Sequence, residues 1–265
     1  MKKKFLLTSV FLCILAGFTN GQDEKRAFFY LETGIDLIGC EAPEKDYIRG
    51  DINLNPYDDV TYGPDFVSDQ ITNLLHTDFL GLKFEYRMLN NKLGMAAGVR
   101  FTRVVSSIGK SSYWSQGSES SEYFYLQYAQ NGTNTEYAKV SSITQKSGYL
   151  GIPLELNIYP FNPHKVNVYF KAGATFNYNI THKTDLVFWN EDMEPYEEEV
   201  AAVIEDPYPF YASLYLGLGL QVRPAGKPGF NLEFCIPVGM ITPAEPGFYD
   251  PNTGVGFRLN FRIPF

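Results

Sequence analysis

The last twelve residues, 254–265, constrain the fold more than any other stretch, because apolar and polar side chains alternate through all of them. One face carries Val255, Phe257, Leu259, Phe261, Ile263 and Phe265, and the other carries Gly256, Arg258, Asn260, Arg262 and Pro264. A period of two residues predicts a β-strand whose two faces meet unlike surroundings. The apolar face of this strand needs either a protein core or lipid.

Seven earlier stretches alternate in the same way. They cover residues 26–38, 78–87, 95–102, 149–159, 166–178, 212–223 and 230–239. The connections are alternately long, over 40–73, 106–146, 181–209 and 242–252, and short, with Asn, Pro and Gly in the short ones. Within the second long connection, Asn131-Gly132 predicts a projecting β-hairpin. The pattern predicts an all-β fold, an eight-stranded antiparallel up-and-down transmembrane β-barrel with external loops and periplasmic turns.

Several features favour lipid over the apolar interior of a soluble, lipocalin-type barrel. The polar faces are rich in glycine and asparagine, which suit a crowded lumen, and aromatic residues gather near strand ends as they do in membrane girdles. Regular alternation of loop lengths is typical of outer-membrane barrels. An arginine or lysine that faces lipid near the midplane costs about 2–4 kcal/mol. The polar faces, Arg258 and Arg262 included, are therefore predicted to point into the lumen.

The inward-facing charges predict a lumen filled by ion pairs. An eight-stranded barrel is just wide enough for its own side chains. The predicted network consists of Glu32, Asp36, Lys83, Glu85, Arg87, Arg100, Glu155, Lys171, Arg223, Glu233, Arg258 and Arg262. Because acids and bases are nearly balanced, we expect a plugged barrel without an open pore. A narrow porin-like channel is the alternative.

Residues 1–21 predict a secretory signal peptide, with a basic start at Lys2-Lys3-Lys4, an apolar run and a cut after Gly21. One barrel domain then covers 22–265. The leader contains three lysines and no acidic residue, so its removal takes the net charge from −8 to about −11. Such an acidic chain is unsuited to binding nucleic acid. Cys40 and Cys235 lie far apart and are predicted to be unpaired, with a single disulfide as the alternative.

The sequence predicts no catalytic residue, cofactor or metal centre. His76, His164 and His182 are assigned to a strand start, a turn and a loop, and no strand pairs a histidine with a nucleophile. The third long connection is acidic around Glu197. It contains Glu191, Asp192, Glu194, Glu197, Glu198, Glu199, Glu205 and Asp206. We interpret it as a solvated loop, and a calcium site is the alternative, although the spacing matches no EF-hand.

Aromatic residues gather in the second long connection. They are Tyr113, Trp114, Tyr123, Phe124, Tyr125 and Tyr128. They can form a recognition surface, for which Tyr113, Trp114, Tyr123 and Tyr125 are the candidate binding residues. They can equally pack the hairpin on itself, and both interpretations stay open.

Three further features point to a known family. They are Gly148-Tyr-Leu-Gly-Ile-Pro-Leu-Glu-Leu-Asn-Ile-Tyr-Pro160, Tyr169-Phe-Lys-Ala-Gly-Ala-Thr175 and the aromatic end at Phe265. In these the chain resembles the PorT-like, or porin-family, outer-membrane β-barrel proteins of the Bacteroidota. The resemblance implies an outer-membrane barrel from a Gram-negative bacterium. One type of family member assists a protein-secretion system, and the family supplies no catalytic motif.

Together these features predict an integral outer-membrane protein that is not an enzyme. We expect it to act through its external loops, in adhesion, ligand binding or partner binding, or as a structural membrane protein. A narrow channel and an accessory of protein secretion are the alternatives. The expected partners are outer-membrane lipid, lipopolysaccharide and an external protein or glycan, and the barrel is expected to be a monomer. Phe265 is predicted to be the signal read by the barrel-assembly machinery.

Overall fold

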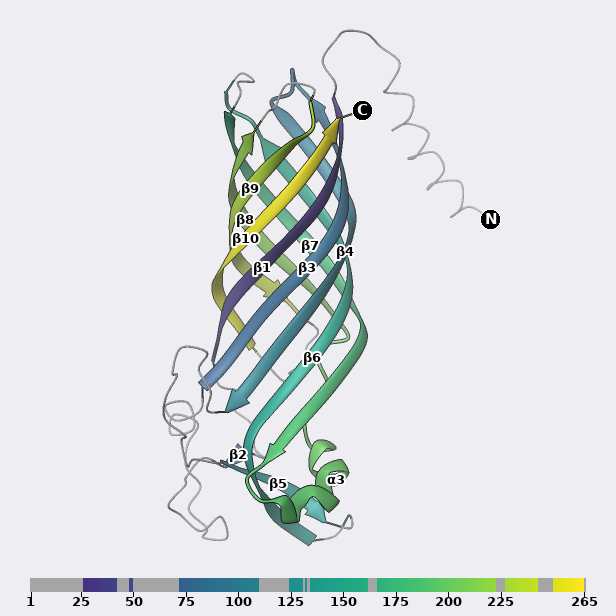
Figure 1. Ribbon diagram of the computed structural model, residues 1–265, viewed down its shortest axis with the longest axis vertical. Coiled ribbons are helices and arrows are strands. Elements are labelled where there is room, and N and C mark those ends of the chain that lie inside the picture. The colour runs from purple at the N-terminus through teal and green to yellow at the C-terminus, as the bar shows by residue number, and fades with distance from the viewer. Residues whose placement is uncertain are drawn as a thin grey trace, which may run out of the picture.

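The computed structural model describes residues 26–41, 48–49, 72–109, 124–130, 132, 134–161, 166–222, 227–242 and 250–264. Eight long strands form a tall barrel (Figure 1). They are β1 (Ala27–Glu41), β3 (Thr72–Met88), β4 (Leu93–Gly109), β6 (Asn134–Ile158), β7 (Val166–Phe188), β8 (Phe210–Val222), β9 (Gly229–Ile241) and β10 (Asp250–Pro264). The predicted signal peptide lies outside the described residues.

The eight strands close into a ring in which each strand pairs with its neighbours in the chain. The order is β6-β4-β3-β1-β10-β9-β8-β7, and β6 also pairs with β7. All these pairings are antiparallel. The last strand pairs with the first, from Phe28 opposite Pro264 to Glu41 opposite Asp250, with one irregularity between Ile38 and Cys40. The predicted eight-stranded up-and-down barrel, closed by its final strand, is confirmed.

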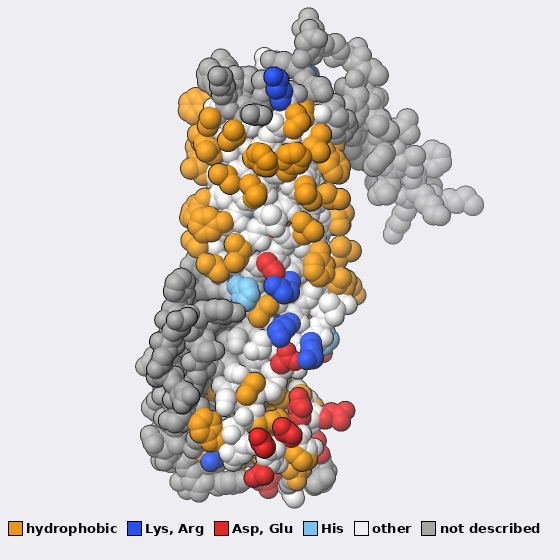
Figure 2. Space-filling view, viewed as in Figure 1, with side chains coloured by type: hydrophobic (Ala, Val, Ile, Leu, Met, Phe, Trp, Pro, Cys, Tyr) orange, Lys and Arg blue, Asp and Glu red, His pale blue; other side chains and the backbone are white. Residues whose placement is uncertain are grey.

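The outer wall carries an apolar belt because outward-facing positions keep their apolar alternation around the ring. On β6, for example, Leu150, Ile152, Leu154, Leu156 and Ile158 are all exposed. Figure 2 shows this belt over the half of the barrel where β1 begins and β10 ends. At that end the connection between β3 and β4 is a tight turn in which Leu89, Asn90 and Asn91 all have positive φ, and asparagine tolerates this conformation.

Three strands run far beyond the predicted boundaries. Parts of 106–146 and 181–209 were predicted to be loops, but β4 continues to Gly109, β6 begins at Asn134 and β7 continues to Phe188. At about 3.4 Å per residue the 25 residues of β6 span about 85 Å, whereas crossing lipid needs only about 9–11 residues. Outside the lipid an outward face can be polar, so the apolar signal fades while the backbone pairing continues.

A cap lies on this extended end of the barrel (Figure 1). It contains β2 (Ile48–Arg49), β5 (Phe124–Gln130), a 3-10 helix η1 (Glu191–Tyr196) and a short helix α3 (Glu197–Ala201). β5 pairs with β6 around Gly132, whose φ is +72°, so the predicted hairpin is confirmed. The acidic stretch, in contrast, was predicted to be a loop and forms η1 and α3. In the described part of the chain, no helix is long and apolar enough to cross a membrane.

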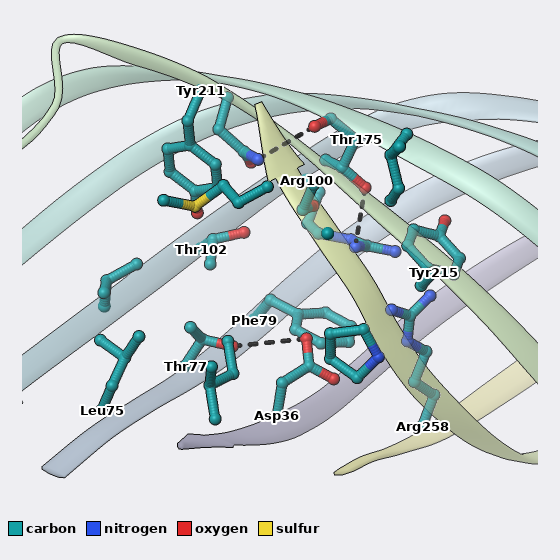
Figure 3. A pocket seen from close by; sticks show the side chains of 18 residues that line it. Asp36, Leu75, Thr77, Phe79, Arg100, Thr102, Thr175, Tyr211, Tyr215 and Arg258 are labelled. Carbon is teal, nitrogen blue, oxygen red and sulfur yellow. Dashed lines mark hydrogen bonds between the residues drawn. The ribbon is translucent and has the colours of Figure 1, made fainter. Parts of the chain in front are cut away.

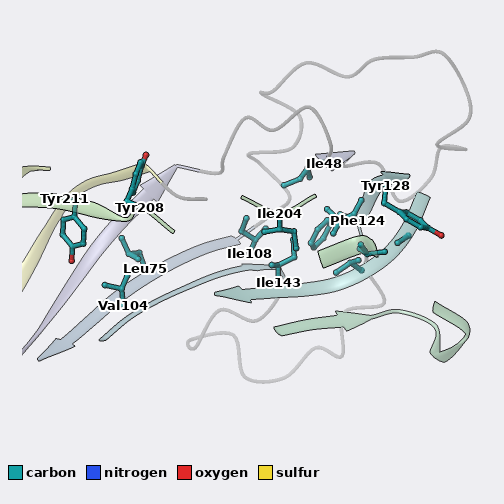
Figure 4. Packing of buried hydrophobic residues seen from close by; sticks show 14 of the residues in the cluster. Ile48, Leu75, Val104, Ile108, Phe124, Tyr128, Ile143, Ile204, Tyr208 and Tyr211 are labelled. Carbon is teal, nitrogen blue, oxygen red and sulfur yellow. The ribbon is translucent and has the colours of Figure 1, made fainter. Parts of the chain in front are cut away.

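The cap has an apolar core of its own, which continues into the barrel mouth (Figure 4). Its buried members include Leu126 of β5, Val140 of β6 and Val200 of α3, each with 0% of its surface exposed. Nearer the barrel, the Tyr149 hydroxyl donates to the Tyr208 carbonyl oxygen at 3.0 Å, and Tyr149 packs edge-on against Tyr211. These contacts hold the segment after α3 across the mouth.

Candidate functional site

The lumen at mid-barrel is crossed by a continuous chain of buried ion pairs. It runs Arg100–Glu32–Lys83–Glu155–Lys171–Glu233, and its successive nitrogen–oxygen distances are 2.7, 2.6, 2.8, 2.8 and 2.6 Å. The six residues come from β4, β1, β3, β6, β7 and β9. Each side chain has at most 4% of its surface exposed. Because strands from all around the ring contribute, the chain of charges spans the lumen.

Glu155 is the centre of this network. Its carboxylate contacts the Lys83 and Lys171 ammonium groups, each at 2.8 Å, and accepts a hydrogen bond from Tyr215 at 2.8 Å. The guanidinium groups of Arg100 and Arg258 lie further away, at 3.7 and 3.8 Å. A buried carboxylate is stable only where such partners replace the water it has lost. The Glu155 carboxylate therefore lies within 4 Å of four cationic side chains in the lumen.

A second ionic group lies towards the short-turn end. Arg87 pairs with Glu85 at 3.2 Å and donates to the Tyr159 hydroxyl at 2.8 Å. Its guanidinium also lies over the rings of Phe28 and Tyr159, at 4.4 and 3.9 Å from their centroids. Glu85 in turn accepts hydrogen bonds from Tyr30, Tyr159 and Asn157. The lumen thus contains charge-assisted contacts at two levels.

Tyrosines complete the packing because small residues opposite them leave room for the rings. A Cβ atom at Gly219 would lie 2.1 Å from the Tyr169 ring, and one at Gly173 would lie 2.5 Å from the Tyr215 ring. The Tyr169 hydroxyl donates to Glu233, and the Tyr215 hydroxyl donates to Glu155. These tyrosines are absent from the network that the sequence predicts. Their inward position in the alternation, opposite glycine, is the signal that could have identified them.

Most of the predicted network residues lie together in the lumen. Glu32, Lys83, Glu85, Arg87, Arg100, Glu155, Lys171, Glu233, Arg258 and Arg262 are all buried. Asp36 is only partly buried and stands apart from the ion pairs, and it accepts a long hydrogen bond of 3.5 Å from Thr77. Arg223 and Phe265 lie outside the described residues. Cys235 is a buried free thiol in β9.

A cavity of about 50 Å³ lies between the network and the cap (Figure 3). Asp36, Arg100 and Arg258 line its network side, and Leu75 and Tyr211 belong to the cap core. Arg100 donates to Thr175 across it at 3.1 Å. Since one water molecule needs roughly 10–15 Å³ of such space, the cavity can hold a few waters.

Of the four aromatic residues proposed for recognition, one lies within the described residues. Tyr113, Trp114 and Tyr123 lie outside the described residues. Tyr125 lies in β5 with 6% of its surface exposed, and its ring packs edge-on against Tyr137 of β6. Tyr125 therefore packs the hairpin on itself, and its ring is buried.

The described residues bring no three His, Cys, Asp or Glu side chains together as a metal site. In the acidic stretch, Glu191, Asp192, Glu194, Glu197 and Glu198 are exposed on η1 and α3. His182 lies at the surface of β7, with its Nε2 atom 3.3 Å from a carboxylate oxygen of Asp206. His164 lies outside the described residues. The cap therefore presents an acidic outer face, seen at the lower end of Figure 2.

No family model and no curated protein matches the chain. Solved structures with a similar fold include the outer membrane protein OprG from Pseudomonas aeruginosa, at 14% identity and a TM-score of 0.43, covering 93% of this chain and all of that one. Another is Ail, the attachment invasion locus protein of Yersinia pestis, in complex with the heparin analogue sucrose octasulfate, at 9% identity and a TM-score of 0.32, covering 91% of this chain and all of that one. A third is the translocator domain of the autotransporter NalP from Neisseria meningitidis, at 8% identity and a TM-score of 0.29, covering 99% and 96% of the two chains.

Likenesses at this level say nothing about what the barrel binds, and the molecule's own geometry decides its class. A closed antiparallel ring leaves no strand edge unpaired in lipid. Its apolar belt and its inward charges match the two faces of a transmembrane barrel. The chain is an integral outer-membrane β-barrel. By the same pattern, we expect the short-turn end to face the periplasm and the capped end to face outward.

Proposed function

We propose that the protein is a closed, non-conducting outer-membrane barrel that presents an ordered external cap to a partner outside the cell. The observation that carries the proposal is the unbroken chain of ion pairs from Arg100 to Glu233 across the lumen. Moving one member aside would leave another buried charge unpaired, which costs about 3–5 kcal/mol. The apolar cap core above the cavity is a second barrier to ions.

We expect no conductance steps above the bilayer background when the folded barrel is inserted into planar bilayers. A porin of 16 to 18 strands, whose lumen is water-filled, serves as the positive control for conductance. Folding of this barrel is checked separately by its anomalous migration on a denaturing gel when unheated, and its insertion is checked by flotation with lipid vesicles. Reproducible unitary steps from verified inserted protein would favour the narrow-channel alternative and contradict the closed lumen.

The cap supports the external part of the proposal, because it is a packed unit. α3 lies against β5, and Gln145 of β6 donates to the Glu205 carbonyl oxygen at 2.9 Å. The exposed carboxylates of η1 and α3 then form a fixed acidic surface. Such a surface favours an external protein or glycan partner that presents cationic groups, and its binding should weaken with salt.

Replacing Val200 with aspartate should unpack the cap and leave the barrel intact. Val200 is fully buried, and an unpaired carboxylate there costs several kcal/mol. We expect faster proteolysis within residues 189–209 and unchanged migration of the unheated barrel on a gel. Glu198→Gln, on the exposed face of the same helix, is the matched control and should keep the wild-type rate. Equal proteolysis of all three proteins would mean that the cap is not held by this core.

We further infer membership of the PorT-like group of the Bacteroidota, and this inference is supported by the residues quoted above. It makes a role as an accessory of protein secretion the second candidate function. The exposed Phe161, next to the buried Tyr159 at the periplasmic end, favours a contact on that side. Co-purification of the barrel with secretion components, lost on Phe161→Ala, would support this role, and its absence would count against it.

A further inference from the structure

A band of charged side chains lies on the outer wall where the apolar belt ends on the cap side. On β3, β4, β6 and β7 the exposed apolar rows stop at Leu80, Phe101, Leu150 and Ile180. The interface patch, as we name it, consists of Asp78, Arg103, Lys146, His182, Lys183 and Asp185. Figure 2 shows blue and red side chains directly beyond the orange belt. The patch therefore lies at the level of the lipid headgroups of the outer leaflet.

Two lysines stand opposite each other in the patch. Lys146 of β6 and Lys183 of β7 are cross-strand partners, and both side chains are exposed. Like charges directly opposite one another destabilise a sheet pair. Asp185 offsets this, since its carboxylate contacts the Lys146 ammonium at 2.8 Å and also the Lys183 ammonium. Asp185 is the one carboxylate that contacts both lysines, so the Lys146–Asp185–Lys183 cluster carries one net positive charge. Asp206 adds a negative charge on the His182 side of the patch, 3.3 Å from the Nε2 atom of His182.

Asp185 also holds the two ammonium groups side by side. The Asp185 carboxylate accepts hydrogen bonds from both Lys146 and Lys183. Each ammonium has three N–H donors, and its bond to Asp185 uses one of them. The other donors can bind a further anion. On β4, Arg103 contacts Asp78 at 2.8 Å, which adds no net charge.

We propose that the Lys146–Lys183 pair binds a phosphate group of a phosphorylated lipid headgroup in the outer leaflet, the class to which lipopolysaccharide belongs. A phosphate carries the negative charge that would balance the second lysine, and its several oxygens can accept hydrogen bonds from both ammonium groups. The position next to the belt favours a headgroup over a soluble phosphate, because the acyl chains of the same molecule would lie on Leu150 and Ile180. The proposal rests on the outward orientation of the cap.

The test is titration of the folded barrel in neutral detergent with lipid A, with lipid A whose phosphates have been removed, and with inorganic phosphate. The wild type should bind the phosphorylated lipid and discriminate against the dephosphorylated one. In Lys146→Gln/Lys183→Gln the affinity should fall about 10- to 30-fold, as expected for two lysines near an anionic surface. Lys146→Arg/Lys183→Arg should retain binding. Lys92→Gln, in the turn at the opposite end, is the matched control.

Three results would overturn the assignment. One is equal affinity in the wild type and the double glutamine variant. Another is equal affinity for the two forms of lipid A. The third is inorganic phosphate binding at the pair as tightly as the lipid, which would make it a soluble-anion site. None of these results would contradict the closed lumen or the packed cap, because those two proposals are tested separately by conductance and by proteolysis.

Discussion

Glu155→Gln is expected to lower the free energy of unfolding by about 3–5 kcal/mol, the cost of removing one partner from a buried ion pair. The substitution keeps the shape of the side chain and removes its charge. Lys83 and Lys171, each 2.8 Å from this carboxylate, then face one another with Arg100 and Arg258 nearby. A buried amide cannot offset these cations, so the folded lumen is destabilised.

The measurement is urea unfolding of the barrel in lipid vesicles, followed by the gel migration of unheated samples. Asp78→Asn is the matched control, because it makes the same chemical change in an ion pair whose Arg103 side chain is 61% exposed. Exposed pairs contribute about 0–1 kcal/mol. If the two variants lose the same small amount, the network does not stabilise the barrel. Adding Lys171→Met to Glu155→Gln should not restore the loss, because Lys171 is also the cation that pairs with the buried Glu233 at 2.6 Å.

Leu154→Arg should destabilise the barrel by about 2–4 kcal/mol, because this position faces the middle of the apolar belt. Leu154 is 47% exposed and lies at the centre of the exposed row from Leu150 to Ile158 on β6. If this position faced water, an arginine there would change the free energy of unfolding little. The size of the loss in stability therefore shows whether the position faces lipid. The same unfolding experiment in vesicles reports it.

Val187→Arg is the control for this substitution. Val187 is also an exposed apolar residue, at 53%, but it lies on β7 beyond the interface patch, outside the belt. We expect its stability to stay close to that of the wild type. Similar losses for both variants would contradict the position of the belt, and no loss for either would contradict a membrane-spanning barrel.

The candidate site could be predicted in part, and the limit has a physical cause. Alternation places Glu32 and Lys83 on inward faces, so their shared lumen follows from the residues alone. Their pairing at 2.6 Å depends on the stagger of β1 against β3, which no local pattern encodes. Tyr125 shows the same limit, because whether an aromatic residue in a polar stretch is exposed depends on the strand that pairs beside it.

By itself, the sequence determined the number of strands, their order and the face that meets lipid. The number and order of the strands follow from the eight alternating stretches along the chain. The face that meets lipid follows from the free-energy cost of placing an arginine such as Arg258 or Arg262 in lipid, which depends on that residue alone. Only the tertiary structure decided which charges meet across the lumen, how far β6 and β7 run beyond the lipid and that the acidic stretch folds as helices in a cap. These depend on closure of the ring and on packing outside the membrane, where apolar alternation is no longer required.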